Sequence, residues 1–135
     1  MNEVGRDITI GGTPYRLVLN VNAYQEIVMK YGGIKELADA MDDKAQQLIT
    51  YPWIIALLAN QGTLLANEGK PGPVLLTPEE VGLRMTPHEL IRQRDAVFGA
   101  IVAGMRGETS PNENKPVDEV LEEIKAEKNG VSAAE

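Results

Sequence analysis

The 135-residue sequence contains no cysteine, one histidine, one tryptophan and one phenylalanine. Without cysteine the chain has no disulfide framework, no thiol nucleophile and no cysteine-based zinc site. The lone histidine, His88, has no second histidine or cysteine to join it as a metal ligand, and we interpret it as a solvated residue in the first turn of a helix. The sequence therefore predicts no metal site.

Sequence motifs of common enzyme classes are also missing. There is no Gly-x-Ser-x-Gly nucleophile motif, no phosphate-binding glycine loop ending in Lys-Ser or Lys-Thr, and no dinucleotide fingerprint. Acidic pairs such as Asp42-Asp43 and Glu79-Glu80 occupy adjacent positions, which point about 100° apart on a helix and do not converge on one substrate atom. We therefore expect a protein that is not an enzyme and needs no cofactor.

Positive charge is scarce, because 13 basic residues face 20 acidic ones and the net charge is −7. No basic stripe with interleaved aromatic residues exists, so nucleic acid is not an expected partner. The longest apolar run, residues 53–59, is far shorter than the roughly 18 residues of a membrane-spanning helix, so we expect no contact with a membrane. The first residues lack the pattern of a secretory signal, and the protein is expected to stay where it is made.

Residues 48–66 form the stretch around which the rest of the chain is organised. Apolar side chains recur there at spacings of three and four, which predicts a helix that is apolar on most faces and must be covered by the core or by a partner. Pro52 fits either as the first residue of this helix or as a kink in a longer helix starting near Asp42. Beside Pro52, we select as candidate protein-binding residues Trp53, Ile54 and Leu57.

The N-terminal region predicts a β-hairpin. Residues 6–10 and 15–19 alternate apolar and polar side chains around a turn, Gly11-Gly12-Thr13-Pro14. A two-stranded hairpin is only marginally stable alone, so its apolar face must pack on other elements. The fold class is therefore α+β and mostly helical, with the hairpin packed on a bundle of about four to five helices.

Periodicity and end signals predict the helices of this bundle. They are expected at residues 23–31, at 34–41, in the central stretch, after Thr77, and at 87–106. Asn20 or Asn22 caps the first helix and Gly32-Gly33 ends it. The pair Asp42-Asp43 is expected to begin the central helix.

The last two helices each begin at a predicted capping box. Thr77-Pro-Glu-Glu80 and Thr86-Pro-His-Glu89 both place threonine at the cap, proline at the first helical position and glutamate three residues after the threonine. On the last helix, charged side chains are interpreted as a solvated face, with a charged rim around a protein contact as the alternative. They are Arg92, Arg94 and Asp95.

Composition divides the chain into a body, residues 1–107, and an acidic tail, residues 108–135. The tail carries eight acidic and three basic residues, so about −5 of the net charge of −7 lies there. A polar linker is followed by one narrow apolar stripe, which predicts a marginal amphipathic helix in a flexible tail. The stripe supplies four further candidate protein-binding residues, Val117, Val120, Leu121 and Ile124.

The order of these elements resembles the tail assembly chaperone family of long-tailed bacteriophages. The resemblance covers roughly residues 6–107 and rests on a pattern of elements and degenerate motifs. These are the hairpin Ile-x-Ile-Gly-Gly-x-x-Tyr-x-Leu-x-Leu at 8–19, the helix ending in Gly-Gly-Ile, the long apolar helix, and Leu-Thr-Pro-Glu-Glu-Val at 76–81.

The resemblance implies a non-enzymatic phage or prophage protein that acts in virion morphogenesis. Such a chaperone binds the tape measure protein in the host bacterial cytoplasm and is absent from the mature virion. In many members a frameshifted C-terminal extension recruits tail tube protein, but residues 108–135 are too short and too generic to match one. Exposed apolar grooves and five methionines would suit this role, an acidic tail would favour solubility, and self-association along the client is compatible with it.

A second class of function is also compatible with the sequence. The chain could be an acidic adaptor or antitoxin-like module that binds one protein through its C-terminal helix, which would fold on contact. The stripe in the tail is the feature behind this alternative.

Overall fold

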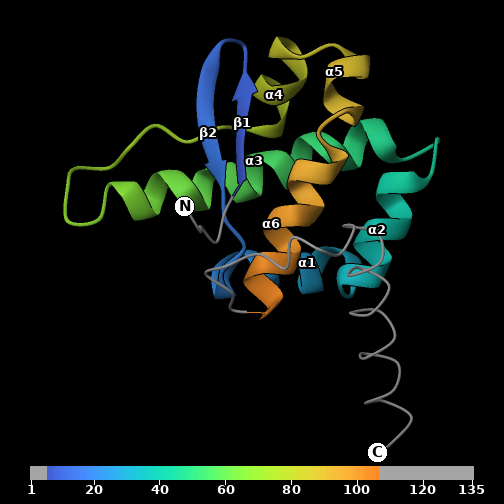
Figure 1. The fold of residues 1–135 in the computed structure, drawn as a ribbon, viewed down its shortest axis with the longest axis horizontal. Coiled ribbons are helices and arrows are strands. Elements are labelled where there is room, and N and C mark those ends of the chain that lie inside the picture. The colour runs from blue at the N-terminus through green and yellow to red at the C-terminus, as the bar shows by residue number, and fades with distance from the viewer. Residues whose placement is uncertain (1–5, 107–135) are drawn as a thin grey trace, which may run out of the picture.

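The computed structural model describes residues 6–106, which form an α+β fold as the sequence predicts (Figure 1). The elements are β1 (Arg6–Ile10), β2 (Thr13–Leu17), α1 (Val21–Tyr31), α2 (Ile34–Asp42), α3 (Gln47–Ala66), α4 (Pro78–Arg84), α5 (Pro87–Ile91) and α6 (Arg94–Arg106). Because α5 and α6 together correspond to the one helix expected at 87–106, the bundle has the expected size.

The hairpin turn is tighter than the sequence predicts. Gly11 and Gly12 alone form it, with φ of 57° and 87°, the left-handed backbone that glycine adopts most easily. Thr13 and Pro14 already belong to β2, which ends at Leu17 instead of residue 19. Pro14 is tolerated in the strand because it pairs with Thr9 at a position where its missing N–H would point away from β1.

The hairpin lies across the middle of α3 (Figure 1). Just after β2, the Val18 N–H donates to the Leu58 carbonyl of α3 at 3.1 Å. Gly62 sits directly under the Arg16 carbonyl, so a Cβ at Gly62 would overlap that oxygen. Glycine costs helix stability, and this close crossing explains its place in α3. Of the apolar face predicted for the hairpin, Ile8, Ile10, Leu17 and Leu19 are buried, while Tyr15 is half-buried and packs against the core.

Helix α1 ends at Tyr31 as predicted but begins at Val21, two residues earlier than expected, with Asn20, one of the two predicted caps, as its cap. The Asn20 side chain accepts the Ala23 N–H at 3.0 Å, and Gly32, at φ 102°, closes the helix in the left-handed conformation. The expectation that Asp42-Asp43 begins the central helix is wrong. Asp42 is the last residue of α2, and the Asp43 side chain accepts the Ala45 N–H at 3.1 Å in a turn that precedes α3.

Helix α3 contains Pro52 in its interior, so the helix starts before the proline, at Gln47. Nine of its residues are buried, and its neighbours include the hairpin, α1, α2, α4, α5 and α6. By length and composition alone α3 could cross a membrane, yet 56% of that apolar stretch is buried inside the protein, and a core helix passes the same test.

Both predicted capping boxes are confirmed. The Thr77 hydroxyl accepts the Glu80 N–H at 3.1 Å while Glu80 accepts the Thr77 N–H at 2.9 Å. The second box repeats this geometry between Thr86 and Glu89, at 3.2 and 3.0 Å.

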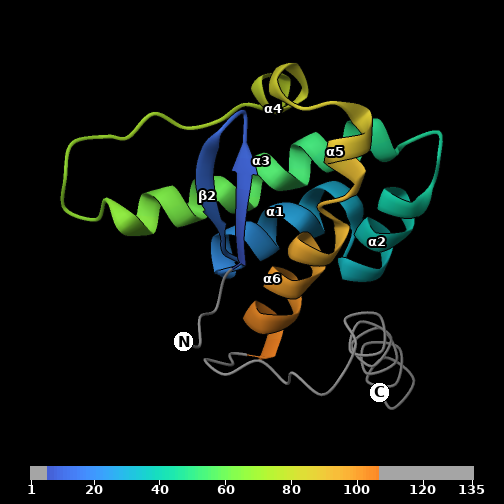
Figure 2. The same ribbon diagram turned by 45° about the horizontal axis from the view of Figure 1, so that its top comes forward.

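The single last helix predicted at 87–106 is wrong in one respect. The chain breaks after Ile91 and resumes as α6 at Arg94. The Gln93 N–H bonds to the Leu90 carbonyl, three residues back, which tightens the chain at the break. After the break α6 lies against the hairpin (Figure 2), and its Gly104 meets the Leu19 backbone.

Candidate protein-binding surface

The three candidate residues on α3 differ in burial. Ile54 is completely buried, while Trp53 and Leu57 are partly buried and pack against the core. Ile54 therefore presents no surface to a partner in this conformation. Trp53 and Leu57 retain some exposed surface.

Trp53 belongs to a structural cluster at the junction of α1 and α3. Its ring meets Tyr31 edge-on, with centroids 5.4 Å apart, and the Lys30 ammonium lies 5.5 Å from its centroid. The Tyr31 hydroxyl is 3.1 Å from the Thr50 hydroxyl oxygen, which fixes the tyrosine on α3. Neighbours within the chain therefore occupy much of the indole surface.

The exposed apolar side chains of α3 lie at its two ends. Leu48 and Ile49 are 50% and 72% exposed in the first turn, and Leu64 and Leu65 are 40% and 47% exposed in the last. The middle of the helix is covered, at Trp53 by Tyr31 of α1 and at Leu58 and Gly62 by β2 and the residue after it. Some apolar side chains of α3 are therefore exposed, but they lie in its first and last turns and not at the predicted residues beside Pro52.

The C-terminal end of α3 projects beyond the hairpin, and the chain returns along it toward α4 (Figures 1 and 2). We call residues 63–76 the α3 arm. Its returning segment adds Val74, which is 92% exposed, and Leu75, which is 40% exposed. With Leu64 and Leu65, these side chains give the arm four exposed apolar residues.

Hydrogen bonds to side-chain amides hold the arm in place. Asn60 bonds to both the N–H and the carbonyl of Leu76, each at 2.8 Å, and Asn67 donates to the Thr63 carbonyl at 2.7 Å. Because Leu76 is fixed at Asn60 and the chain runs back along α3, Val74 and Leu75 lie toward the same end of the helix as Leu64 and Leu65. These bonds fix the end of α3 and the point at which the arm returns to it.

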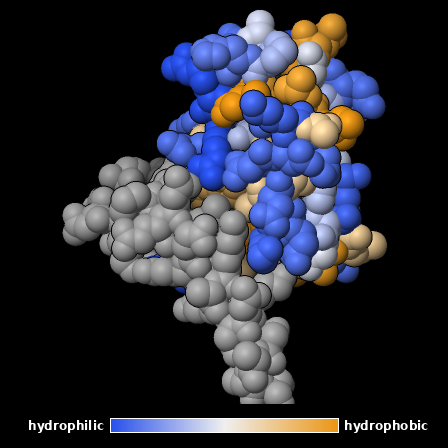
Figure 3. Space-filling view, turned by 90° about the vertical axis from the view of Figure 1, so that its right-hand side faces the viewer, coloured by the Kyte–Doolittle hydropathy of each residue, from blue (hydrophilic) through white to orange (hydrophobic). Residues whose placement is uncertain are grey.

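The face that carries α2, α5 and the start of α3 differs in character. It is mainly hydrophilic, with separate apolar groups in its upper half (Figure 3). Exposed single apolar side chains are normal on protein surfaces. Leu83 on α4 is 83% exposed and lies outside the arm, so it provides a matched control for the leucines of the arm.

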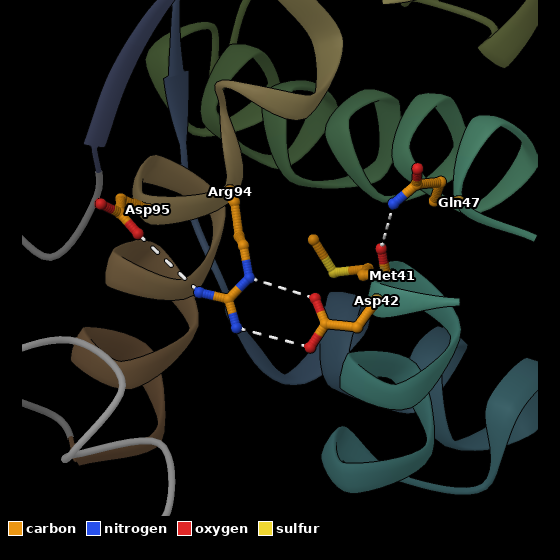
Figure 4. A network of polar contacts seen from close by, with 5 residues as sticks. All are labelled: Met41, Asp42, Gln47, Arg94 and Asp95. Carbon is orange, nitrogen blue, oxygen red and sulfur yellow. Dashed lines mark hydrogen bonds and ion pairs between the residues drawn. The ribbon is translucent and has the colours of Figure 1, made fainter. Parts of the chain in front are cut away.

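Arg94 links α6 to α2, so its interpretation as part of a solvated face is wrong. Its guanidinium lies 3.2 and 3.5 Å from the two carboxylate oxygens of Asp42 and 3.9 Å from Asp95 (Figure 4). Its Cζ also sits 4.7 Å from the Phe98 ring centroid. Of these contacts the sequence indicates only the one with Phe98, because Arg94 and Phe98 are four residues apart and share one face of a helix. Arg92 and His88 are exposed, as interpreted.

Two side chains near these elements have shifted pKa values. Burial raises the pKa of Tyr51 to about 12, against a lowering effect of Arg94 and smaller raising effects of Asp42 and Asp95. The Gln46 side chain and the Ala45 N–H lower the pKa of Asp43 by hydrogen bonding. Within residues 6–106 no group of three or more acidic, histidine or cysteine side chains could hold a metal ion.

The candidate residues Val117, Val120, Leu121 and Ile124 lie outside the described residues. No protein-family model, curated protein or solved structure matches the chain. The resemblance to the tail assembly chaperones therefore stays a prediction from the sequence pattern.

Proposed function

We propose that this protein is a non-enzymatic chaperone of phage tail assembly, which binds the tape measure protein before the tail tube polymerises around it. The observation that carries the proposal is the α3 arm, with Leu64, Leu65, Val74 and Leu75 exposed on a projection whose return is fixed at Leu76. Large exposed apolar patches mark sites of protein contact, and these four exposed side chains all lie on one projection.

The arm has the geometry that an apolar client requires. A helix end and a returning extended segment lie side by side, so the apolar groups of both can contact one amphipathic client helix. The Asn60–Leu76 bonds orient the arm before binding, which reduces the entropy cost of association.

The proposal includes the place and timing of the interaction. Binding occurs in the host bacterial cytoplasm and the chaperone leaves before the virion is complete. Recruitment of tail tube protein and self-association along the client are extensions of the same proposal.

Co-expression with the tape measure protein encoded nearby tests the proposal. The expected result is that the client becomes soluble and co-purifies with the full chain. A Leu64→Ser/Leu65→Ser variant should lose the client, because it removes much of the apolar area of the arm. Leu83→Ser changes an exposed leucine elsewhere and should keep binding. A client that stays insoluble with the unaltered chain contradicts the chaperone function.

The adaptor alternative gives the opposite pattern in the same assay. Leu121→Ser and Ile124→Ser in the full chain should abolish capture of its single partner, while the variant of the arm should leave capture unchanged. That pattern would reject the arm as the client surface.

A further inference from the structure

Helix α3 has one face that the other elements leave partly open. Ile49, Trp53 and Leu57 follow one another at four-residue spacing, so they share this face. Ile49 is 72% exposed, and Trp53 and Leu57 are only partly buried. The neighbouring position Leu58, by contrast, lies under the residue after β2 and is completely buried. We call Ile49, Trp53 and Leu57 the open face of α3.

Helix α1 places a positive charge at the border of the open face. The exposed Lys30 ammonium lies 5.5 Å from the Trp53 ring centroid, and no ion pair to Lys30 occurs among residues 6–106. The acidic neighbour of Lys30 on α1 is Glu26, one turn earlier. An occupant would therefore gain from an acidic side chain at the Lys30 end of the border and from apolar groups along the face.

Helix α6 ends near the other end of the open face. Gly104, in its last turn, lies against the Leu19 backbone. The next residue, Asn20, donates to the Gln61 side chain of α3 at 3.0 Å, one turn beyond Leu57. The acidic tail therefore leaves the body near the Leu57 end of the face.

The tail is long enough to reach the whole open face. Residues 107–116 separate α6 from the apolar stripe of the tail, and these ten residues span at most about 33–36 Å when extended. Along α3, the path from Gln61 back to Ile49 covers about 18 Å. As a helix, residues 117–124 would cover about 11 Å, close to the length of α3 between Ile49 and Leu57.

The sequence of this segment matches the open face in order and in chemistry. Its apolar side chains lie on one side of the helix that the sequence predicts, namely Val117, Val120, Leu121 and Ile124. A segment that arrives near Leu57 and runs toward Ile49 is antiparallel to α3. Its later residues, Glu122 and Glu123, then come to the Lys30 end. A linker of this length gives an effective concentration on the order of millimolar, so weak contacts are sufficient.

We propose that residues 117–124 bind as a helix to the open face of α3 in the same chain, with an acidic side chain beside Lys30. The docked segment covers the exposed part of Trp53. A partner protein that binds the apolar stripe of the tail has to displace the segment from α3, so the body competes with that partner. This site is separate from the α3 arm and does not depend on the chaperone function.

The fluorescence of Trp53, the only tryptophan, tests docking in the full chain. Leu121→Ser removes an apolar group of the stripe, whereas the control Val131→Ser removes one elsewhere in the tail. Acrylamide should quench Trp53 about twofold faster in Leu121→Ser than in the unaltered chain, because a weak intramolecular site is about half filled at this effective concentration. Val131→Ser should leave the quenching rate unchanged. Equal quenching rates in all three chains would overturn the proposal.

A matched pair of variants on α3 tests the face itself. Ile49→Ser changes the open face, and Leu48→Ser changes the adjacent exposed residue, which points about 100° away. Hydrogen exchange of the amides of residues 117–124 should accelerate about twofold in Ile49→Ser, as docking is lost, and stay unchanged in Leu48→Ser. Equal exchange rates in these two variants contradict the assignment of the face.

The charge at the border is tested by the same exchange measurement. Lys30→Gln should accelerate exchange at residues 117–124 by up to about twofold at low salt, and added salt should reduce the difference from the unaltered chain. Lys70→Gln makes the same charge change in the loop after α3 and should leave exchange unchanged. Equal effects of the two variants contradict a pairing at Lys30.

Dependence on protein concentration distinguishes other occupants of the open face. Protection of residues 117–124 that is independent of concentration supports docking within one chain. Protection that rises with concentration would assign the face to the tail of a second copy. Exchange as fast as in a free peptide of the same sequence would leave the face to a partner protein. Either of the last two results overturns the proposal.

Discussion

Asn60 of α3 holds the backbone of Leu76 with two hydrogen bonds of 2.8 Å. Its Nδ2 donates to the Leu76 carbonyl and its Oδ1 accepts the Leu76 N–H. The amide of Asn60 thus satisfies both backbone groups of Leu76, as a neighbouring strand would. Leu76 is only 8% exposed and needs such partners within the protein. This pair fixes the return of the α3 arm and its four exposed apolar side chains.

Asn60→Ala should therefore destabilise the fold and loosen the arm. The substitution leaves both backbone groups of Leu76 without their partner, which should lower the free energy of unfolding by about 1–3 kcal/mol. Urea denaturation measures the loss, and hydrogen exchange at residues 70–76 should accelerate. Asn22→Ala, on the exposed side of α1, is the control and should change neither. Equal exchange in the two variants would contradict this role of Asn60.

Gly62→Ala and Gly82→Ala should change stability in opposite directions. A Cβ at Gly62 would overlap the Arg16 carbonyl, so the hairpin must move, at a cost of about 1–3 kcal/mol. Gly82 in α4 has nothing within 4 Å of that position, so alanine should stabilise the helix by about 0.5–1 kcal/mol. Thermal unfolding compares both with the unaltered chain, and a shift of the same sign in both would refute the close crossing.

Features specified by neighbouring residues were predictable from the sequence. The capping boxes at Thr77 and Thr86, the Asn20 cap and the glycine turn each depend on side chain–backbone geometry within a few positions. The break between α5 and α6 was not predictable in this way. The apolar periodicity continues through it, and the contact of Arg94 with Asp42 joins residues 52 positions apart.

The candidate protein-binding residues on α3 likewise combine a feature that the sequence predicts with one that depends on long-range contacts. A helix that is apolar on most faces signals burial, and Ile54 is indeed buried, but periodicity does not indicate which parts of such a helix are covered. That depends on where the hairpin crosses, at Gly62, and on Tyr31 reaching Trp53 from α1. The exposed ends of α3 follow from these long-range contacts.

Tyr51 should make stability fall at alkaline pH. Burial raises its pKa to about 12 in the folded chain, against 10.0 for an unperturbed tyrosine. The contribution is complete below pH 10, where both states are protonated, and is lost as pH rises toward 12 because the unfolded chain releases the proton first. Denaturation at several pH values measures how the free energy of unfolding falls between pH 10 and 12. In Tyr51→Phe this fall should be less steep, by the slope that corresponds to the release of about one proton. Parallel curves for the two chains would contradict the raised pKa.

Arg94→Gln should weaken the attachment of α6 to α2. The change removes the ion pair with Asp42 and the contact with the Phe98 ring, and should lower the free energy of unfolding by about 1 kcal/mol. Because the side chain of Asp42 is 52% exposed, added salt should screen the ion-pair part and narrow the difference from the unaltered chain. Urea midpoints at low and high salt measure both effects. Arg92→Gln makes the same charge change at an exposed position and should leave the midpoint nearly unchanged, so equal losses in the two variants would show that net charge, and not the contact with Asp42, is responsible.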